Sequence, residues 1–341
     1  MTGGAEPSPS EAPAAGTPPG PPGARVFSLE GRPAAGLYLL GWLLSLAGAG
    51  LFFVAIFASD RGAAIALSVV ALLLLALGLA AAAGYQLLAR AGRPAERYRG
   101  PSPAILFGLT FALGNAIMLV LGPAGLIDPR HPFGFLAALL IVAALYVLVV
   151  LVFAVRAGAL GRADLGLPSG AAARPARLVE DILFALAVAL PATIGGLLVA
   201  GVVGLLLDVR APRAFPLPST PAEALVVAIG VVLVAPIGEE VFFRGFAVSA
   251  WRRDLGARSA LVRSAVFFGL VHIANIDAAT FAEGAKQAIL ELIVIVPLGL
   301  VLGWLFLRRG LVAAIAGHVV YNGLLLALLA LALSSGAVPG G

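Results

Sequence analysis

Apolar runs long enough to cross a lipid bilayer recur along most of this chain of 341 residues. About 20 apolar residues in a helix span a hydrocarbon core about 30 Å thick, and the runs here have about 17 to 29 residues. Inside lipid the backbone must satisfy its own hydrogen bonds, which a helix does within one segment. The chain is 61% hydrophobic and 11% charged, whereas soluble domains have about 25% charged residues. The sequence therefore predicts an all-α polytopic transmembrane bundle, an integral multi-pass membrane protein.

Nine spans account for these apolar runs. We expect them at 37–58, 62–89, 103–122, 133–155, 179–207, 222–250, 260–276, 287–307 and 311–333. Short cytoplasmic connections carry an excess of Lys and Arg, so the basic residues indicate the orientation. With the N-terminus inside, sixteen of the 22 basic residues fall in inner segments, five in outer segments, and Arg244 within a span. We therefore predict that the N-terminus is inside, and the strong preference for Arg over Lys favours a bacterial plasma membrane.

The connections divide the chain into two membrane-spanning parts with a tail at each end. Residues 1–36 are rich in Pro and Gly and cannot build a core, so we expect a disordered cytoplasmic tail. Four spans at 37–155 form an N-terminal extension without an ionisable residue deep in a span. A cytoplasmic linker at 156–178 leads to a second membrane domain at 179–334, and residues 335–341 form the C-terminal tail.

Two adjacent carboxylates and an arginine lie inside the span 222–250, in the segment Glu239-Glu240-Val-Phe-Phe-Arg244. Ionisable residues inside a membrane span are costly and by default mark functional sites. Glu240 and Arg244 are four residues apart, so they lie on one helix face and can form an ion pair. Such a pair could serve only to stabilise the span, but it leaves Glu239 without a partner on its own helix. Two neighbouring carboxylates do not both ionise easily in a low dielectric, so Glu239 is a candidate general base.

Two later spans each carry a histidine among apolar residues. In the pattern Phe268-x-x-x-His272 the aromatic ring can pack beneath the imidazole, although such a histidine can also be a core residue bonded to a backbone carbonyl. In the pattern His318-x-x-x-Asn322 the imidazole and the amide share one helix face and can donate to one oxygen. Counted from the inner ends of their spans, Glu239, His272 and His318 lie at a similar depth, roughly 13 to 20 Å. We therefore expect a shared polar cavity that opens inward.

Composition excludes several other kinds of site. The chain has no cysteine, so disulfides, thiolate metal ligands and a catalytic thiol are excluded. The arginines are spread over short loops without an accompanying aromatic or Gly-rich binding motif, so a nucleic-acid partner is not expected. The expected partners are the lipid bilayer and a peptide or membrane-protein substrate.

The three patterns together resemble the signature motifs of the CAAX protease and bacteriocin-processing family, which includes the type II CAAX prenyl endopeptidases. The motifs are Glu239-Glu240-x-x-x-Arg244, Phe268-x-x-x-His272 and His318-x-x-x-Asn322, and they occur in the family's order. The resemblance covers about 176–334 and implies an intramembrane endopeptidase that cuts a peptide bond near the cytoplasmic side.

The resemblance also implies roles for the motif residues. Glu239 would activate a water molecule with help from His272, and His318 and Asn322 would stabilise the oxyanion. Glu240 and Arg244 would organise the site, and Phe268 would contact substrate. We expect no cofactor, although Glu239, His272 and His318 could hold zinc as three ligands, and the chain lacks a His-Glu-x-x-His pattern.

Two other classes of function use similar residues. Intramembrane Glu, Arg and His also suit a proton-coupled transporter, but transporters often contain inverted repeats, and none is evident here. A non-catalytic binding or immunity protein could keep the same fold without hydrolysing a substrate. The intact motifs favour the enzyme over both alternatives.

Overall fold

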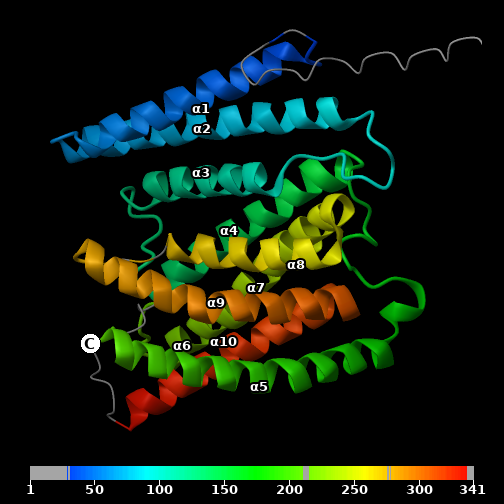
Figure 1. The fold of residues 1–341 in the computed structure, drawn as a ribbon. Helices are drawn as coiled ribbons and strands as arrows, with labels where there is room; N and C mark the ends of the chain where they lie inside the picture. The colour runs from blue at the N-terminus through cyan, green and yellow to red at the C-terminus, as the bar shows by residue number, and fades with distance from the viewer. Residues whose placement is uncertain (1–28, 30, 210–214, 275, 277, 336–341) are drawn as a thin grey trace, which may run out of the picture.

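A bundle of helices makes up the computed structural model, which describes residues 29, 31–209, 215–274, 276 and 278–335 (Figure 1). The α-helices are α1 (Ala35–Ile56), α2 (Arg61–Arg90), α3 (Pro103–Leu121), α4 (Pro132–Val150), α5 (Pro175–Leu207), α6 (Pro221–Ala228), α7 (Ala235–Glu240), α8 (Ser249–Ile273), α9 (Phe281–Arg309) and α10 (Leu311–Ser334). Three π-helical segments continue α-helices: η1 (Leu151–Arg156) follows α4, η3 (Ile229–Val234) follows α6, and η4 (Val241–Val248) follows α7. A 3₁₀ turn, η2 (Gly170–Ala173), precedes α5. No strand occurs in the described ranges, which confirms the all-α prediction. Most of both predicted tails lies outside those ranges.

Eight helical stretches within the described ranges are long and apolar enough to cross a membrane. The longest, Pro221–Ile273, runs from α6 through η3, α7 and η4 to α8, but it reverses direction at Gly256. Gly256 has φ 79° and ψ 167°, a conformation that glycine adopts without steric cost. The hydroxyl of Ser264 donates to the carbonyl of Phe243 at 3.1 Å, although 21 residues of straight helix would separate them by about 31 Å. This stretch is therefore a hairpin of two helical legs, as the separate predicted spans 222–250 and 260–276 require, so the eight stretches in the described ranges comprise nine apolar legs.

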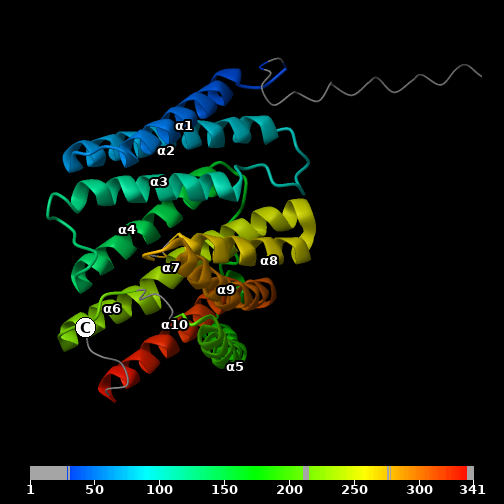
Figure 2. The same cartoon turned by 60° about the vertical axis from the view of Figure 1, so that its left-hand side comes forward.

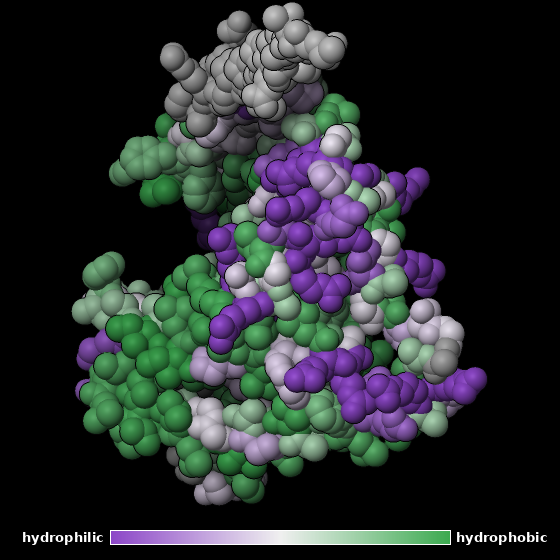
Figure 3. All heavy atoms as spheres, turned by 45° about the vertical axis from the view of Figure 1, so that its right-hand side comes forward, coloured by the Kyte–Doolittle hydropathy of each residue, from purple (hydrophilic) through white to green (hydrophobic). Residues whose placement is uncertain are grey.

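The connections predicted to be cytoplasmic meet at one end of the molecule. Hydrophilic residues gather over this end in Figure 3, on the side where Figure 1 shows the α2–α3 and α4–α5 connections and the tip of α8. Ion pairs join these connections: Arg93 with Asp254, Arg253 with Asp164, and Arg309 with Asp181. The structure thus brings the Arg-rich segments together, and the identity of the membrane side on which they lie stays a prediction.

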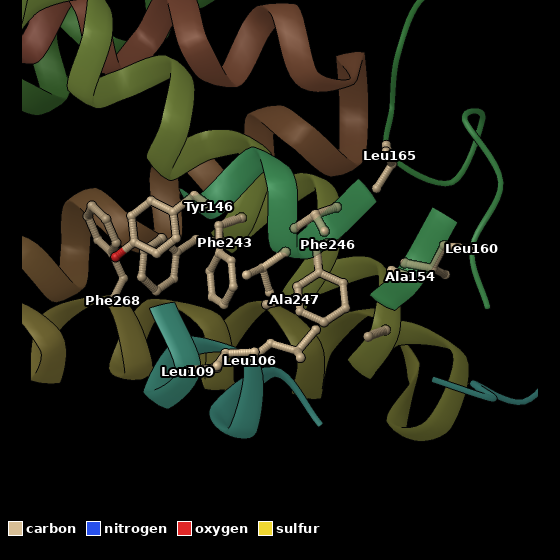
Figure 4. Packing of buried hydrophobic residues seen from close by; sticks show 14 of the residues in the cluster. Leu106, Leu109, Tyr146, Ala154, Leu160, Leu165, Phe243, Phe246, Ala247 and Phe268 are labelled. Atoms are coloured by element: carbon tan, nitrogen blue, oxygen red, sulfur yellow. The ribbon is translucent and has the colours of Figure 1, made fainter. Parts of the chain in front are cut away.

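The front and rear halves of the chain share one packed core. Helix α4 approaches α7 so closely that a methyl group added at Gly238 would lie 2.7 Å from the Cα of Ala143. Tyr146 of α4 also packs against Phe242 of η4, with ring centroids 4.8 Å apart. Figure 4 shows Tyr146 beside Phe243, above leucines from α3. The hairpin of α1 and α2 lies at the edge of the bundle, outside α3 (Figure 2). The front half therefore reaches the rear half through α3, α4 and the α2–α3 connection.

Candidate active site

The first motif lies on a short α-helix between two π-helical segments. In η3 the N–H of Ala235 bonds to the carbonyl of Gly230, five residues back. The next bond of this pattern would run from residue 236 to Val231, but Pro236 has no N–H to donate. The Nδ2 amide of Asn322 on α10 donates to the Val231 carbonyl instead, at 2.8 Å. Asn322 therefore satisfies a carbonyl that Pro236 leaves unpaired, and this bond ties α10 to η3.

Glu240 and Arg244 form a fully buried ion pair. Arg244 Nη1 lies 2.8 Å from Glu240 Oε1, and both side chains are 0% exposed, as the four-residue spacing predicts. His318 Nδ1 lies 2.8 Å from the same Glu240 oxygen, and Arg244 Nη2 donates to the carbonyl of Gly299 at 3.5 Å. Removing one partner of such a pair leaves an uncompensated buried charge. These contacts therefore join η4, α9 and α10 around one carboxylate.

Glu239 is the accessible carboxylate of the two. Its side chain is 24% exposed, and Oε2 lies 3.8 Å from His318 Nε2. The His318 imidazole thus lies between Glu240 on its Nδ1 side and Glu239 on its Nε2 side. A neutral imidazole has one N–H, so His318 can donate to both carboxylates only in its charged form. Glu239 is consequently a carboxylate that a reactant can reach, whereas Glu240 is buried in contact with Arg244 and His318.

Phe268 is the packing centre of the second motif. Its ring is buried and meets the rings of His272 and His318 edge to face, at centroid distances of 4.4 and 5.9 Å. The Arg244 guanidinium carbon lies 4.2 Å from the centroid of the same ring, a cation–π contact. Phe268 thus touches polar groups of all three motifs. Substrate contact by Phe268, as the resemblance implied, would require this packing to open.

A backbone contact fixes the tautomer of His272. Its Nδ1 lies 2.7 Å from the carbonyl oxygen of Phe268, and because a carbonyl only accepts hydrogen bonds, Nδ1 carries the proton. The Nε2 of the neutral ring is then an unprotonated nitrogen. The same hydrogen bond is the one expected of a core histidine, so the backbone contact alone does not decide between the two roles of His272.

The two residues of the third motif contact different groups. His318 is directed to the two glutamates, whereas the amide of Asn322 donates to Val231. The donors used in these bonds therefore go to different oxygens. The reason is the unpaired Val231 carbonyl, which the linear sequence does not reveal. The second N–H of the Asn322 amide is not required by this bond, and the oxyanion role stays a prediction.

The residues proposed as zinc ligands are not arranged to hold an ion. Within the described ranges, no three His, Asp or Glu side chains converge as a metal site would require. Glu239 and His318 approach each other, but His272 uses Nδ1 on its own backbone. No catalytic step is therefore derived through a metal, and independence from metal stays a prediction.

A further acidic residue, Glu291, lies near the motifs and is missed when only the motifs are considered. It is half-buried on α9, and electrostatic interactions connect its side chain with His272 and Tyr321. The signal for it in the sequence is an isolated acidic residue in an apolar span.

A cavity of about 500 Å³ lies near the start of α9 and is lined by Asp208, Glu283 and neighbouring residues, without any motif residue.

Comparison with known proteins identifies the segment that contains these motifs. Residues 221–324 match the family described as type II CAAX prenyl endopeptidase, Rce1-like. No curated protein and no solved structure matches the chain. The matched segment begins later than the resemblance at about 176–334 and leaves out α5, but it contains all three motifs. Over residues 221–324, the chain is similar to type II CAAX prenyl endopeptidases of the Rce1-like kind.

Proposed function

We propose that this protein is an intramembrane endopeptidase in which Glu239 activates the hydrolytic water. The observation that carries the proposal is the difference between the two adjacent glutamates. Glu240 is fully buried and contacts both Arg244 and His318, whereas Glu239 keeps 24% of its side chain exposed. A general base must reach the proton that it removes, and Glu239 is the member of the pair that can do so.

The proposed reaction is hydrolysis of a peptide bond. As the water oxygen bonds to the peptide carbonyl carbon, one water proton moves to Glu239, and the π electrons of the C=O bond move to the oxygen, which becomes an oxyanion. When the tetrahedral intermediate collapses, the C=O bond re-forms, the C–N bond breaks, and the proton from Glu239 passes to the leaving amine nitrogen. Glu239 is thereby restored as a carboxylate, and the overall reaction consumes one water molecule. His272 contacts the Phe268 ring, which Arg244 and His318 also contact, and its unprotonated Nε2 is assigned to orienting the water.

Donors for the oxyanion come from α10 in this proposal. His318 in its charged form and the second N–H of Asn322 are the groups assigned to it. Donors aimed at developing charge contribute about 10²–10³-fold each in other hydrolases. We propose that the bond is cut near the Arg-rich end of the bundle, and the positive-inside distribution of the arginines supports the assignment of this end to the cytoplasm. A prenylated CAAX peptide is the substrate class suggested by the family description.

The proposal is tested with purified protein in proteoliposomes, using prenylated and unprenylated CAAX peptides. Glu239→Gln conserves size but cannot accept a proton, so turnover should fall by about 10²–10⁴-fold. Glu180→Gln is the matched control, because Glu180 is exposed at the start of α5 and pairs with Arg177. Turnover near that of the unaltered protein in Glu239→Gln would contradict the glutamate-base mechanism.

Elemental analysis of the active protein tests the proposed independence from metal. We expect substoichiometric metal and activity that survives chelation. One zinc per chain, together with activity that is lost on chelation and restored by zinc, would replace the metal-free mechanism with one in which His272 and His318 are ligands.

A further inference from the structure

Glu291 lies within the membrane-spanning part of α9, four residues inside the predicted start of the span at residue 287. It follows the N-terminal cap Thr280 by eleven residues, which corresponds to about 16 Å along the helix. The residues that surround it in the sequence, from Ala288 to Leu300, are apolar except for Glu291 itself. A carboxylate at this depth is costly unless it faces a polar partner, and such residues by default have a function. Glu291 is therefore expected to face a polar partner.

The packing register of α8 against α9 places Glu291 opposite His272. The two helices are antiparallel and approach closely at three glycines. On α9, a methyl group added at Gly303 would lie 2.6 Å from Leu261 of α8, and one added at Gly299 would lie 2.9 Å from Ala265 of α8. On α8, a methyl group added at Gly269 would lie 2.7 Å from Val296 of α9. The contacts thus move forward along α8, from 261 to 265 to 269, as they move backward along α9, from 303 to 299 to 296. The next turn of α8 carries His272, and the facing turn of α9 carries Glu291.

Electrostatic interactions agree with this register. The charge on Glu291 interacts with His272, and Tyr321 of α10 also interacts with Glu291. The other charged or titratable groups of the site lie on neighbouring elements. Glu239 and Arg244 come from α7 and η4, and His318 and Tyr321 come from α10. Glu291 is thus the acidic group that α9 contributes to the surroundings of His272.

We propose that Glu291 is a positioning residue for His272 in the peptidase reaction. This inference rests on the proposed function, in which the Nε2 of His272 orients the hydrolytic water. The Phe268 carbonyl holds the ring at Nδ1, and the carboxylate across the helix interface supplies the second anchor. It also stabilises the positive charge that His272 carries if it takes up a proton during turnover. Carboxylates that orient a functional imidazole typically contribute about 10–100-fold to activity.

Kinetic measurements on two variants and one control test this role. In proteoliposomes, Glu291→Gln should lower kcat by about 10–100-fold with KM changed less than about twofold, because orientation of the water is a turnover property. Glu291→Asp should recover part of the loss. Glu283→Gln is the control, because Glu283 lies at the start of the same helix, away from the motifs. Unchanged kcat in Glu291→Gln, or a change confined to KM, would overturn the proposal.

A measurement without substrate separates this inference from the proposed function. The chain has three histidines, so the ¹⁵N ring signals of His272 can be assigned by comparison with His272→Gln. Glu291→Gln should shift these signals while leaving those of His131 in place. If the unaltered protein cuts no peptide but the His272 signals shift, the proposed function fails and the pairing stands. If peptide is cut but the His272 signals do not move, the pairing fails and the proposed function stands.

Discussion

The hairpin of α1 and α2 and the hairpin that carries the first two motifs are both apolar, but different interactions hold them together. The α1–α2 hairpin relies on close approach of small residues. A methyl group at Gly48 would lie 2.7 Å from the carbonyl of Ala71, and one at Gly78 would lie 2.6 Å from the backbone nitrogen of Ser45. Such small-residue contacts are the usual basis of helix association in lipid.

The motif-bearing hairpin instead contains charged and amide groups that reach other helices. Glu240, Arg244, His318 and Asn322 connect η3, α7, η4, α9 and α10 through the four polar contacts described above. Buried polar groups contribute little to stability when compared with apolar packing, so their presence is explained by function rather than by folding. The comparison teaches that small residues are sufficient for membrane packing, while the ionisable groups mark where chemistry is expected.

Arg244→Ala should produce the largest loss of stability, because Glu240 would be left buried without its cation. The expected cost is about 3–5 kcal/mol in the free energy of unfolding, measured by thermal denaturation in detergent. Arg252→Ala, at an exposed arginine farther along the same hairpin, is the control and should unfold like the unaltered protein. Equal stability of the two variants would show that the charged pair does not hold the motif hairpin.

Gly78→Ala tests the other side of the comparison. The added methyl group meets the α1 backbone, so we expect a loss of about 1–3 kcal/mol from overpacking, with peptidase activity retained in the protein that remains folded. Gly84→Ala is the matched control on the same helix, because its added methyl group would lie at an ordinary 3.5 Å from Leu37. A loss of activity in folded Gly78→Ala would show that the two hairpins are not independent.

Substitutions of Asn322 and Pro236 should have non-additive effects on the free energy of unfolding. Asn322→Ala leaves the Val231 carbonyl without its donor, and the expected cost is about 1–3 kcal/mol. Pro236→Ala restores a backbone N–H that can take over this bond, so the double variant should be more stable than the sum of the single changes predicts. The coupling, measured by a double-mutant cycle, should be about 0.5–3 kcal/mol.

Activity in the same cycle separates the structural and catalytic roles of Asn322. If turnover remains low in the double variant while stability recovers, Asn322 also acts on the substrate. If turnover recovers together with stability, its oxyanion role is contradicted.

Arg93→Ala should have the smallest effect. Arg93 pairs with Asp254 at the tip of the motif hairpin at 3.4 Å, but its side chain is 40% exposed. Exposed ion pairs contribute about 0–1 kcal/mol, and we expect a change in this range that decreases with added salt. A larger loss would mean that the front half of the chain holds the motif hairpin mainly through this connection.

The sequence was sufficient for features that depend on spacing within one helix. The Glu240–Arg244 pair follows from an interval of four residues, and the two passes on either side of Gly256 follow from separate apolar runs. Contacts between helices were not predictable in the same way. The Asn322–Val231 bond depends on a π-helical register 91 residues away, and the register from which we infer that Glu291 faces His272 depends on glycines between α8 and α9. Periodicity indicates a face of one helix but not the helix that it meets.

The bond between Asn322 and Val231 has a consequence for the biogenesis of the protein. Chains fold from the N-terminus during synthesis, so the passes that bear Glu239 and His272 enter the membrane before α10. Until α10 arrives, Glu240 has Arg244 but no imidazole, and the carbonyl that Pro236 leaves unpaired has no donor. Insertion of α10 supplies both groups at once. A nascent chain therefore acquires the complete set of these contacts only after its last described pass is in place.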